Sequence, residues 1–263
     1  MNMREILNYK NGYYEINREE RNLAAILYHT LLFGNNLKRF LDKINCEFQI
    51  VEHEMGIYFE YAFIRDLWAS IDKKDEKLRR KLILDLLKPN NRSELEKLTI
   101  FQFNDYFGAV REGSNSHFIQ SPGNWSMLRF DKNISDNEEF LRTCKFKWCF
   151  KAIPDIVIHI SHDTAVCIET KLESPEGKYP SSEKEEKDIF TRRNHDRIGQ
   201  CDVQKMIMEE MLGIKSDFVF ILKKKKSSSK NKDKTTLLTW KEAFEGLDIV
   251  QCPFFIREWI NNL

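Results

Sequence analysis

AIPDIVIHISHDTAVCIETKLES, residues 152–174, sets an acid before one run of Ile and Val, and an acid and a lysine at the end of the next. Strand interiors normally exclude Asp and Glu, so these charges need either solvent or a chemical role. A tight turn at Ser161–Asp163 predicts two antiparallel strands, with Ile156 opposite Ile168. All the bulky aliphatic side chains then share one face of the hairpin, as a buried face requires.

The charged residues fall on the other face. In the same register Asp155 lies opposite Glu169, with Cβ atoms about 5 Å apart, and Lys171 follows on that face. Two carboxylates this close repel each other unless a proton or a cation lies between them. A hard divalent ion about 2.1 Å from each oxygen suits the spacing, and Mg²⁺ prefers carboxylate oxygens and water. The pattern therefore predicts a Mg²⁺ site, in which Mn²⁺ can substitute.

Pro154-Asp155, a spacer and Glu169-Thr170-Lys171 resemble the PD-(D/E)XK nuclease superfamily, which has the restriction-endonuclease-like fold. The resemblance covers about residues 145–222. It implies that Asp155 and Glu169 bind the metal, that Thr170 contributes its backbone oxygen, and that Lys171 positions or activates the attacking water. The implied activity is metal-dependent hydrolysis of phosphodiester bonds, most of all by a DNA endonuclease in restriction or anti-phage defence.

Two other interpretations stay open. The hairpin can be an ordinary one, with a polar face in water and Glu169 neutralised by Lys171. The chain can also be a catalytically inactive nucleic-acid-binding or regulatory protein on the same fold. The (D/E)-x-K string alone does not decide between these interpretations. It recurs in polar stretches of the chain, at Asp72-x-Lys74, Asp75-x-Lys77 and Glu185-x-Lys187.

The patterns elsewhere predict an α/β (α+β) protein: a restriction-endonuclease-like mixed β-sheet core flanked by helices. We expect this core over residues 136–263 and a mainly helical N-terminal region, packed on it, over residues 1–135. The expected strands span 145–152, 154–160, 164–171, 216–222 and 235–240. The expected helices span 17–33, with Asn17 and Glu20 as a capping box, 37–44, 52–71, 75–88, 93–106, a short segment capped by Asp136, and 189–213, with two further pieces at the end of the chain.

Further polar residues are candidates for the same site. Gln200 and Gln204 lie one turn apart on the helix expected after the motif, which is similar to a glutamine-bearing motif of the RecB-like branch. They can act behind the metal ligands or simply face solvent. Arg192, Arg193 and Arg197 precede them, and they can bind phosphates or form an exposed helical turn.

Glu60 is the candidate fourth acid for the metal. On a helix over 52–71 it would share a face with Ile57 and Ile64, where a carboxylate needs a partner or a metal ion. Some members of the superfamily supply such an acid from an N-terminal helix. The alternative is a Glu60 paired with a nearby base such as Arg65.

His159 falls on the face of Asp155, and His162 is expected only in the turn. The run KKKKSSSKNKDK, residues 223–234, can hold phosphate without reading sequence, or it can be a solvated hairpin loop.

Bulk composition limits the partners only weakly. The 263 residues include 42 basic and 41 acidic ones, so a nucleic-acid surface must come from local clustering. The six cysteines contain no CxxC pair, which argues against a zinc site. The chain shows no Arg-flanked apolar leader and no apolar run of membrane length, so we expect a cytoplasmic protein without membrane association. A single site per chain must act twice to cut both strands of DNA, which favours a homodimer.

Overall fold

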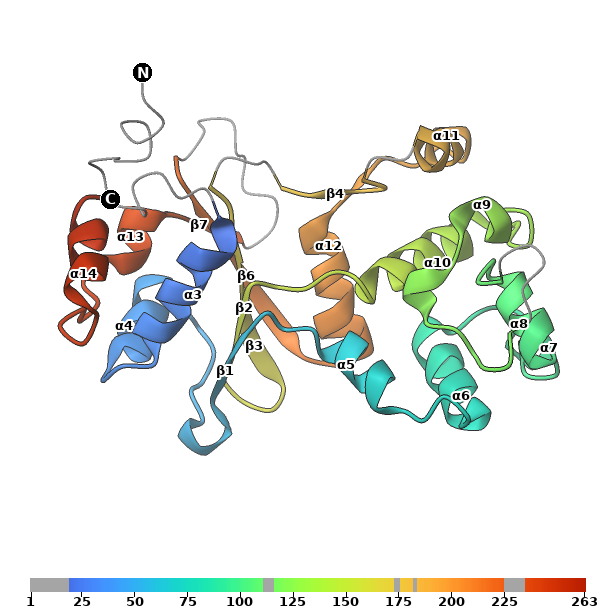
Figure 1. Cartoon of the computed structure of the whole chain (residues 1–263), viewed down its shortest axis with the longest axis horizontal. Helices are drawn as coiled ribbons and strands as arrows, with labels where there is room; N and C mark the ends of the chain where they lie inside the picture. Colours follow the sequence, from blue (N-terminus) through green and yellow to red (C-terminus); the bar gives the residue numbers. More distant parts are fainter. Residues whose placement is uncertain (1–18, 111–115, 173–175, 182–183, 225–234) are drawn as a thin grey trace, which may run out of the picture. The chain divides into compact units, whose positions relative to one another are not determined.

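The computed structural model describes residues 19–110, 116–172, 176–181, 184–224 and 235–263, which form a mixed α/β protein. The chain divides into two compact units (Figure 1). The sheet unit contains Met1–Phe59, Asp155–Pro175 and Asp217–Leu263, and the helical unit contains Glu60–Pro154 and Glu176–Ser216. This division by contacts does not coincide with the boundary expected at residue 135, because the N-terminal segment and the hairpin belong to one unit.

The described residues form a five-stranded mixed sheet. Its spatial order is β1 (Gly56–Phe59), β2 (Ile156–His159), β3 (Thr164–Thr170), β6 (Lys215–Leu222) and β7 (Thr235–Thr239). β1 and β3 both run antiparallel to β2, whereas β6 and β7 are parallel. The predicted hairpin register is confirmed, because Ile156 lies opposite Ile168.

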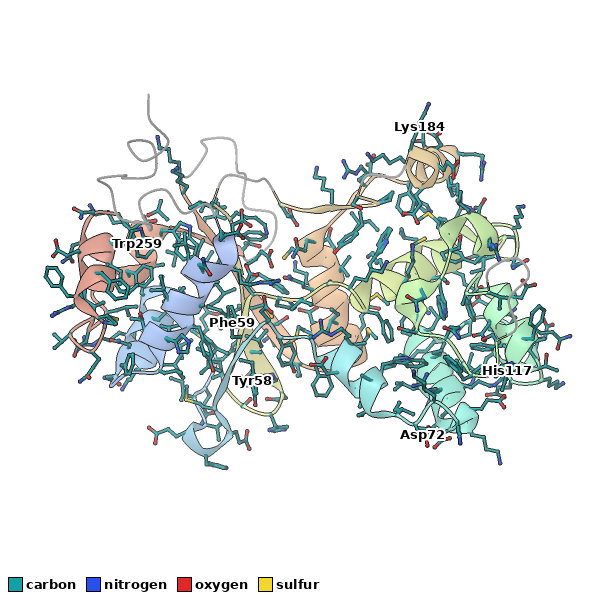
Figure 2. All side chains as sticks on the ribbon, viewed as in Figure 1. Tyr58, Phe59, Asp72, His117, Lys184 and Trp259 are labelled. Atoms are coloured by element: carbon teal, nitrogen blue, oxygen red, sulfur yellow. The ribbon has the colours of Figure 1, made fainter. Side chains whose placement is uncertain are left out.

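The core of the sheet unit covers one face of this sheet. Ile156, Ile158 and Ile168 pack there against α3 (Glu20–Leu31), α4 (Asn36–Lys43), α13 (Trp240–Phe244) and α14 (Phe254–Asn261). Figure 2 shows Phe59 beside α3, where its ring lies 5.7 Å from that of Tyr28. Burying these aliphatic side chains holds β2 and β3 in the predicted register, because a slip by one residue would move all of them to the other face.

The other face of the hairpin is also buried. Val157, Ala165 and Cys167 are each no more than 1% exposed. The interpretation in which this face meets water is therefore wrong, and Glu169, which is 2% exposed, is a carboxylate taken out of solvent. Such a group needs a compensating partner.

The helix expected over 52–71 is wrong. The segment forms a short 3₁₀ turn at Glu52–Glu54, then strand β1, and then α5 (Phe63–Ser70). Gly-Ile-Tyr-Phe suits a pleated edge strand, and pairing with β2 outweighs the apolar spacing that suggested a helix. Glu60 lies between β1 and α5 with φ 51°, so it is not on a helical face.

Several expected helices are confirmed. α3 and α4 match the helices expected over 17–33 and 37–44, although residue 17 and its predicted capping role lie outside the described residues. α6 (Glu76–Leu87) begins where Asp75 accepts a hydrogen bond from the backbone N–H of Leu78, and it ends at Lys88 with φ 50°. The two pieces at the end of the chain are α13 and α14.

The strand expected over 145–152 is wrong. Asp136 accepts from the N–H of Glu139 at 2.7 Å, as the predicted cap, but α10 (Asn137–Cys149) then runs through the whole segment. Phe140, Cys144 and Trp148 are spaced four residues apart and are all buried. The segment therefore has apolar residues at helical spacing as well as the alternating pattern that is typical of a strand.

The single helix expected over 93–106 is also divided. It consists of α7 (Arg92–Leu95) and α8 (Ile100–Tyr106), and the second helix has its own capping box at Thr99 and Gln102. α9 (Met127–Phe130) lies in the stretch that follows, which is rich in Gly, Ser and Asn.

The helix expected over 189–213 is interrupted. α11 (Lys184–Arg192) stops before Asn194, whose φ of 58° cannot continue a right-handed helix. β5 (Ile198–Gly199) then pairs with β4 (Lys178–Tyr179), and α12 (Gln200–Lys205) continues as a π-helix at Met206–Met211. The predicted end at Gly213 is confirmed by its φ of +70°.

Two further features follow from the described residues. Because β6 and β7 are parallel, the lysine run between them does not close a hairpin, and its residues 225–234 lie outside the description. Among the described helices, none combines the length and apolar character that crossing a bilayer requires.

Candidate active site at the end of β3

Glu169 and Lys171 form an ion pair at the end of β3. Lys171 Nζ donates to Glu169 Oε1 at 2.6 Å, and the lysine side chain is 12% exposed. The two residues alternate with Thr170, so their side chains leave the strand on the same face. The backbone N–H of Lys171 donates to Ile221 O of β6 at 2.7 Å, which fixes the main chain at this point of the sheet.

Asp155 does not pair with Glu169 in the ladder as expected, because β2 begins only at Ile156. Its Oδ2 instead accepts two hydrogen bonds of 2.7 Å, from the backbone N–H and from the hydroxyl of Thr170. Successive N–H groups of a strand point to opposite sides, and since that of Lys171 points to β6, that of Thr170 points to β2. The Asp155 carboxylate thus takes the place of the backbone acceptor that β2 lacks here.

Glu20 is an acid that the sequence analysis did not assign to this site. It is the first residue of α3, and its Oε2 lies 3.6 Å from Lys171 Nζ. Its Oε1 accepts from the backbone N–H of Leu172 at 2.9 Å. Glu20 is thus an acid on an N-terminal helix that lies beside Lys171, whereas Glu60 is not on a helix.

Lys171 is held as an ammonium ion. Burial by itself would lower the pKa of Lys171, but the charge and hydrogen bond of Glu169 outweigh it, and Glu20 and Asp155 act in the same direction. The net result is a pKa raised above the usual value for lysine. At neutral pH this side chain can orient and stabilise negative charge, but it has no lone pair with which to take a proton.

The donor set suits a hard divalent ion. Asp155 and Glu169 offer carboxylate oxygens, and both bonds to Asp155 end on Oδ2, so Oδ1 is the oxygen that a cation can take. A cation at Glu169 would share its carboxylate with the Lys171 ammonium. No cluster of three or more His, Cys, Asp and Glu side chains with ligand geometry occurs in the part of the chain that the structure describes.

The predicted glutamines lie in the helical unit. Gln200 and Gln204 share one face of α12, as expected from their spacing, and Gln204 is 1% exposed. A solvent-facing role is therefore wrong for Gln204. Asp155, Glu169 and Lys171 belong to the sheet unit.

The predicted phosphate-binding arginines are engaged within the helical unit. Arg193 donates to Asp131 and to the carbonyl oxygens of Asp131 and Ile134, and its guanidinium lies 4.2 Å from the centre of the Phe140 ring. Arg192 Nη2 lies 2.6 Å from Asp131 Oδ2, but its side chain is largely exposed. These contacts favour a structural role for Arg193.

Arg197 also binds main-chain oxygens. It donates to the carbonyl groups of Pro180 and Lys178 at 3.0 Å and of Ser181 at 3.2 Å. This arginine therefore stabilises the segment around β4, and its Nε and Nη2 groups make these hydrogen bonds.

The two histidines near the motif differ. The ring of His159 lies edge-on to Tyr58 at 5.4 Å, and burial lowers the pKa of His159. The exposed His162 contacts Glu54 Oε2 through its backbone N–H and its Nδ1, and the hydrogen bond to Glu54 raises the pKa of His162. His162 is thus a turn residue, as expected.

Comparison of this chain with protein-family models, with curated proteins and with solved structures gives no match. The resemblance to the PD-(D/E)XK nucleases therefore rests on the motif residues of the sequence.

Proposed function

We propose that this protein is a Mg²⁺-dependent nuclease that hydrolyses phosphodiester bonds, with DNA as its substrate. The observation that supports the proposal is the grouping of acids at the end of β3, where Glu169 Oε1 lies 2.6 Å and Glu20 Oε2 lies 3.6 Å from Lys171 Nζ, and where Asp155 also raises the pKa of Lys171. Carboxylate oxygens grouped in this way are the ligands that Mg²⁺ prefers.

Each residue has a role that its contacts support. Asp155 and Glu169 would hold the ion, together with the backbone oxygen of Thr170 that the resemblance implies, and Glu20 is a further oxygen donor near Lys171. When bound, Mg²⁺ supplies a Lewis acid for a phosphoryl oxygen. Lys171, as an ammonium ion, orients the attacking water and stabilises the charge that develops on phosphate.

The proposal includes a setting and an assembly. A cytoplasmic enzyme of restriction or anti-phage defence suits the activity, and a homodimer would allow one site to cut each strand. The mixed sheet supports the coarse fold class that the resemblance implies.

A catalytically inactive protein on the same fold is the second candidate. It is favoured by the direct contact of 2.6 Å between Glu169 and Lys171, in which the two charges already satisfy each other. Under this proposal the protein would bind nucleic acid or a partner without cleaving it.

A nicking assay separates the two candidates. Supercoiled plasmid, single-stranded DNA and RNA are incubated with the full chain and Mg²⁺, and with EDTA in a parallel series. We expect Mg²⁺-dependent cleavage that is lost in Asp155→Asn and retained in Asp42→Asn, whose carboxylate is exposed on α4. Binding without cleavage by the unaltered protein would favour the inactive candidate. Cleavage of RNA alone would correct the substrate class.

A further inference from the structure

Thr170 lies next to Glu169 and Lys171, and the role proposed for it uses only its backbone oxygen as a metal ligand. Its side chain makes a contact that this role does not require. The residue is 0% exposed. Its hydroxyl donates to Asp155 Oδ2 at 2.7 Å, and its backbone N–H donates to the same oxygen at the same distance. A hydroxyl bond to a carboxylate is charge-assisted and therefore stronger than one between neutral groups.

Two hydrogen-bond donors on Oδ2 restrict the orientation of the Asp155 carboxylate. The position of the Thr170 N–H is fixed by β3. With this hydrogen bond alone, the Asp155 carboxylate could still rotate about it. The hydroxyl adds a second fixed point, so the plane of the carboxylate is determined and Oδ1 is directed away from Thr170. Groups that orient a metal ligand in this way commonly change metal affinity by about 10–100-fold when they are removed.

We propose that the Thr170 side chain is a positioning residue, which fixes the Asp155 carboxylate so that Oδ1 is presented to a divalent cation. This inference rests on the proposed function, because it assumes that Asp155 is a metal ligand. It goes beyond the resemblance, which uses only the backbone oxygen of Thr170 and leaves its side chain without a role. It also makes the hydroxyl, rather than the size of the side chain, the important property.

Thr170→Val tests the inference, because it replaces the hydroxyl by a methyl group and leaves the N–H bond in place. Mn²⁺ affinity of the full chain is measured by titration calorimetry, without nucleic acid. We expect Thr170→Val to weaken Mn²⁺ binding by about 10-fold or more, and Thr170→Ser to retain it, since serine keeps the donor. The matched control is Thr30→Val, which removes another buried hydroxyl of the sheet unit, one that donates to Ile26 O at 2.8 Å. This control should bind Mn²⁺ as the unaltered protein does.

The outcomes separate the inference from the proposed function. If the unaltered protein binds no Mn²⁺ and cleaves no nucleic acid, the proposed function fails and the inference with it. If the unaltered protein binds Mn²⁺ and Thr170→Val binds it equally well, only the inference is overturned. Thr170→Ala replaces the valine variant if that variant does not fold. Loss of the fold in both would assign the hydroxyl to stability and would also overturn the inference.

Discussion

Two largely buried cations of this protein, Arg79 in the helical unit and Lys171 in the sheet unit, have different surroundings. In the helical unit, Arg79 is 3% exposed and donates to the carbonyl oxygens of Ile71, Asp72 and Ile119. Its guanidinium also lies 4.6 Å from the ring of Trp68. Neutral oxygens and an aromatic face satisfy the cation, and the result is a charge that is fully engaged by the fold.

In the sheet unit the balance is different. Lys171 has Glu169 at 2.6 Å and Glu20 at 3.6 Å, and Asp155 also acts on it. Glu169 is 2% exposed, so this carboxylate is held out of water beside the ammonium group of Lys171. Both regions bury charge, but Arg79 is bound by neutral oxygens and an aromatic ring, whereas Lys171 lies among carboxylates, which are also ligands for a divalent cation.

The largest expected effect is on cleavage. Lys171→Met should lower the rate of Mg²⁺-dependent nicking by on the order of 10²–10³-fold, because a fixed positive charge at the developing phosphate charge is lost. Lys43→Met is the matched control, since Lys43 donates to the carbonyl oxygen of Glu242 in the same unit and should be dispensable for cleavage. Equal rates for the two variants would contradict the role of Lys171.

Lys171→Met also leaves Glu169 buried without its ion-pair partner, which should lower the free energy of unfolding by about 3 kcal/mol. The double variant Glu169→Gln/Lys171→Met removes both charges. We expect it to recover most of that stability in chemical denaturation while remaining inactive. A double variant that regained cleavage would show that the ion pair acts only on the fold.

The helical unit should show the reverse behaviour. Arg79→Met removes the donor of three carbonyl groups and should lower the free energy of unfolding by about 3 kcal/mol, because buried acceptors are left unsatisfied. The cleavage rate per folded molecule should not change at a temperature where the variant is folded. Denaturation curves and nicking rates on the same preparation check this, and a catalytic defect without a loss of stability would contradict a purely structural role of Arg79.

Glu20→Gln should have a smaller effect. It keeps an acceptor for the N–H of Leu172 but removes one negative charge near Lys171, and we expect nicking to slow by about 10-fold, with weaker Mg²⁺ dependence. The neighbouring Glu19→Gln is the control, because Glu19 lies at the same helix terminus and is exposed. If both variants cleave at the rate of the unaltered protein, Glu20 is not part of the site.

The smallest expected effect is that of pH on Lys171. Because the pKa of Lys171 in the folded protein is raised above its usual value of 10.5, its stabilising charge is present below that value and is lost only as the pH rises through the raised pKa. Between about pH 7 and pH 9 this group should therefore cause no fall in stability or in cleavage. A cleavage rate that rises with an apparent pKa in this range, and loses that rise in Lys171→Arg, would instead show that the lysine acts as a base.

The sequence predicts local features of the site well and distant ones poorly. The hairpin register was predictable because a period of two leaves one arrangement with Ile156 and Ile168 on the same face. The contact of Asp155 with Thr170 was not, because it depends on β2 beginning only at Ile156, opposite Ile168, while β3 continues to Thr170. Glu20 lies 152 positions from Leu172 along the chain, and no local pattern signals that the start of α3 reaches β3.

The wrongly predicted helix over 52–71 and strand over 145–152 have a related cause. Gly56–Phe59 is a short edge strand whose partner, β2, lies a hundred residues later, so its pairing is invisible to local spacing. The alternating Phe146, Trp148 and Phe150 suggested a strand, although the same region also has buried residues at helical spacing. Tertiary contacts decided both cases.

Mn²⁺ binding followed by electron paramagnetic resonance shows whether the acids around Lys171 hold a divalent cation, as we propose. We expect the unaltered protein to bind Mn²⁺, Mg²⁺ to displace it, and Asp155→Asn to lose this binding while Asp42→Asn keeps it. Absence of Mn²⁺ binding in the unaltered protein, or equal binding in Asp155→Asn, would rule out a metal site at these acids.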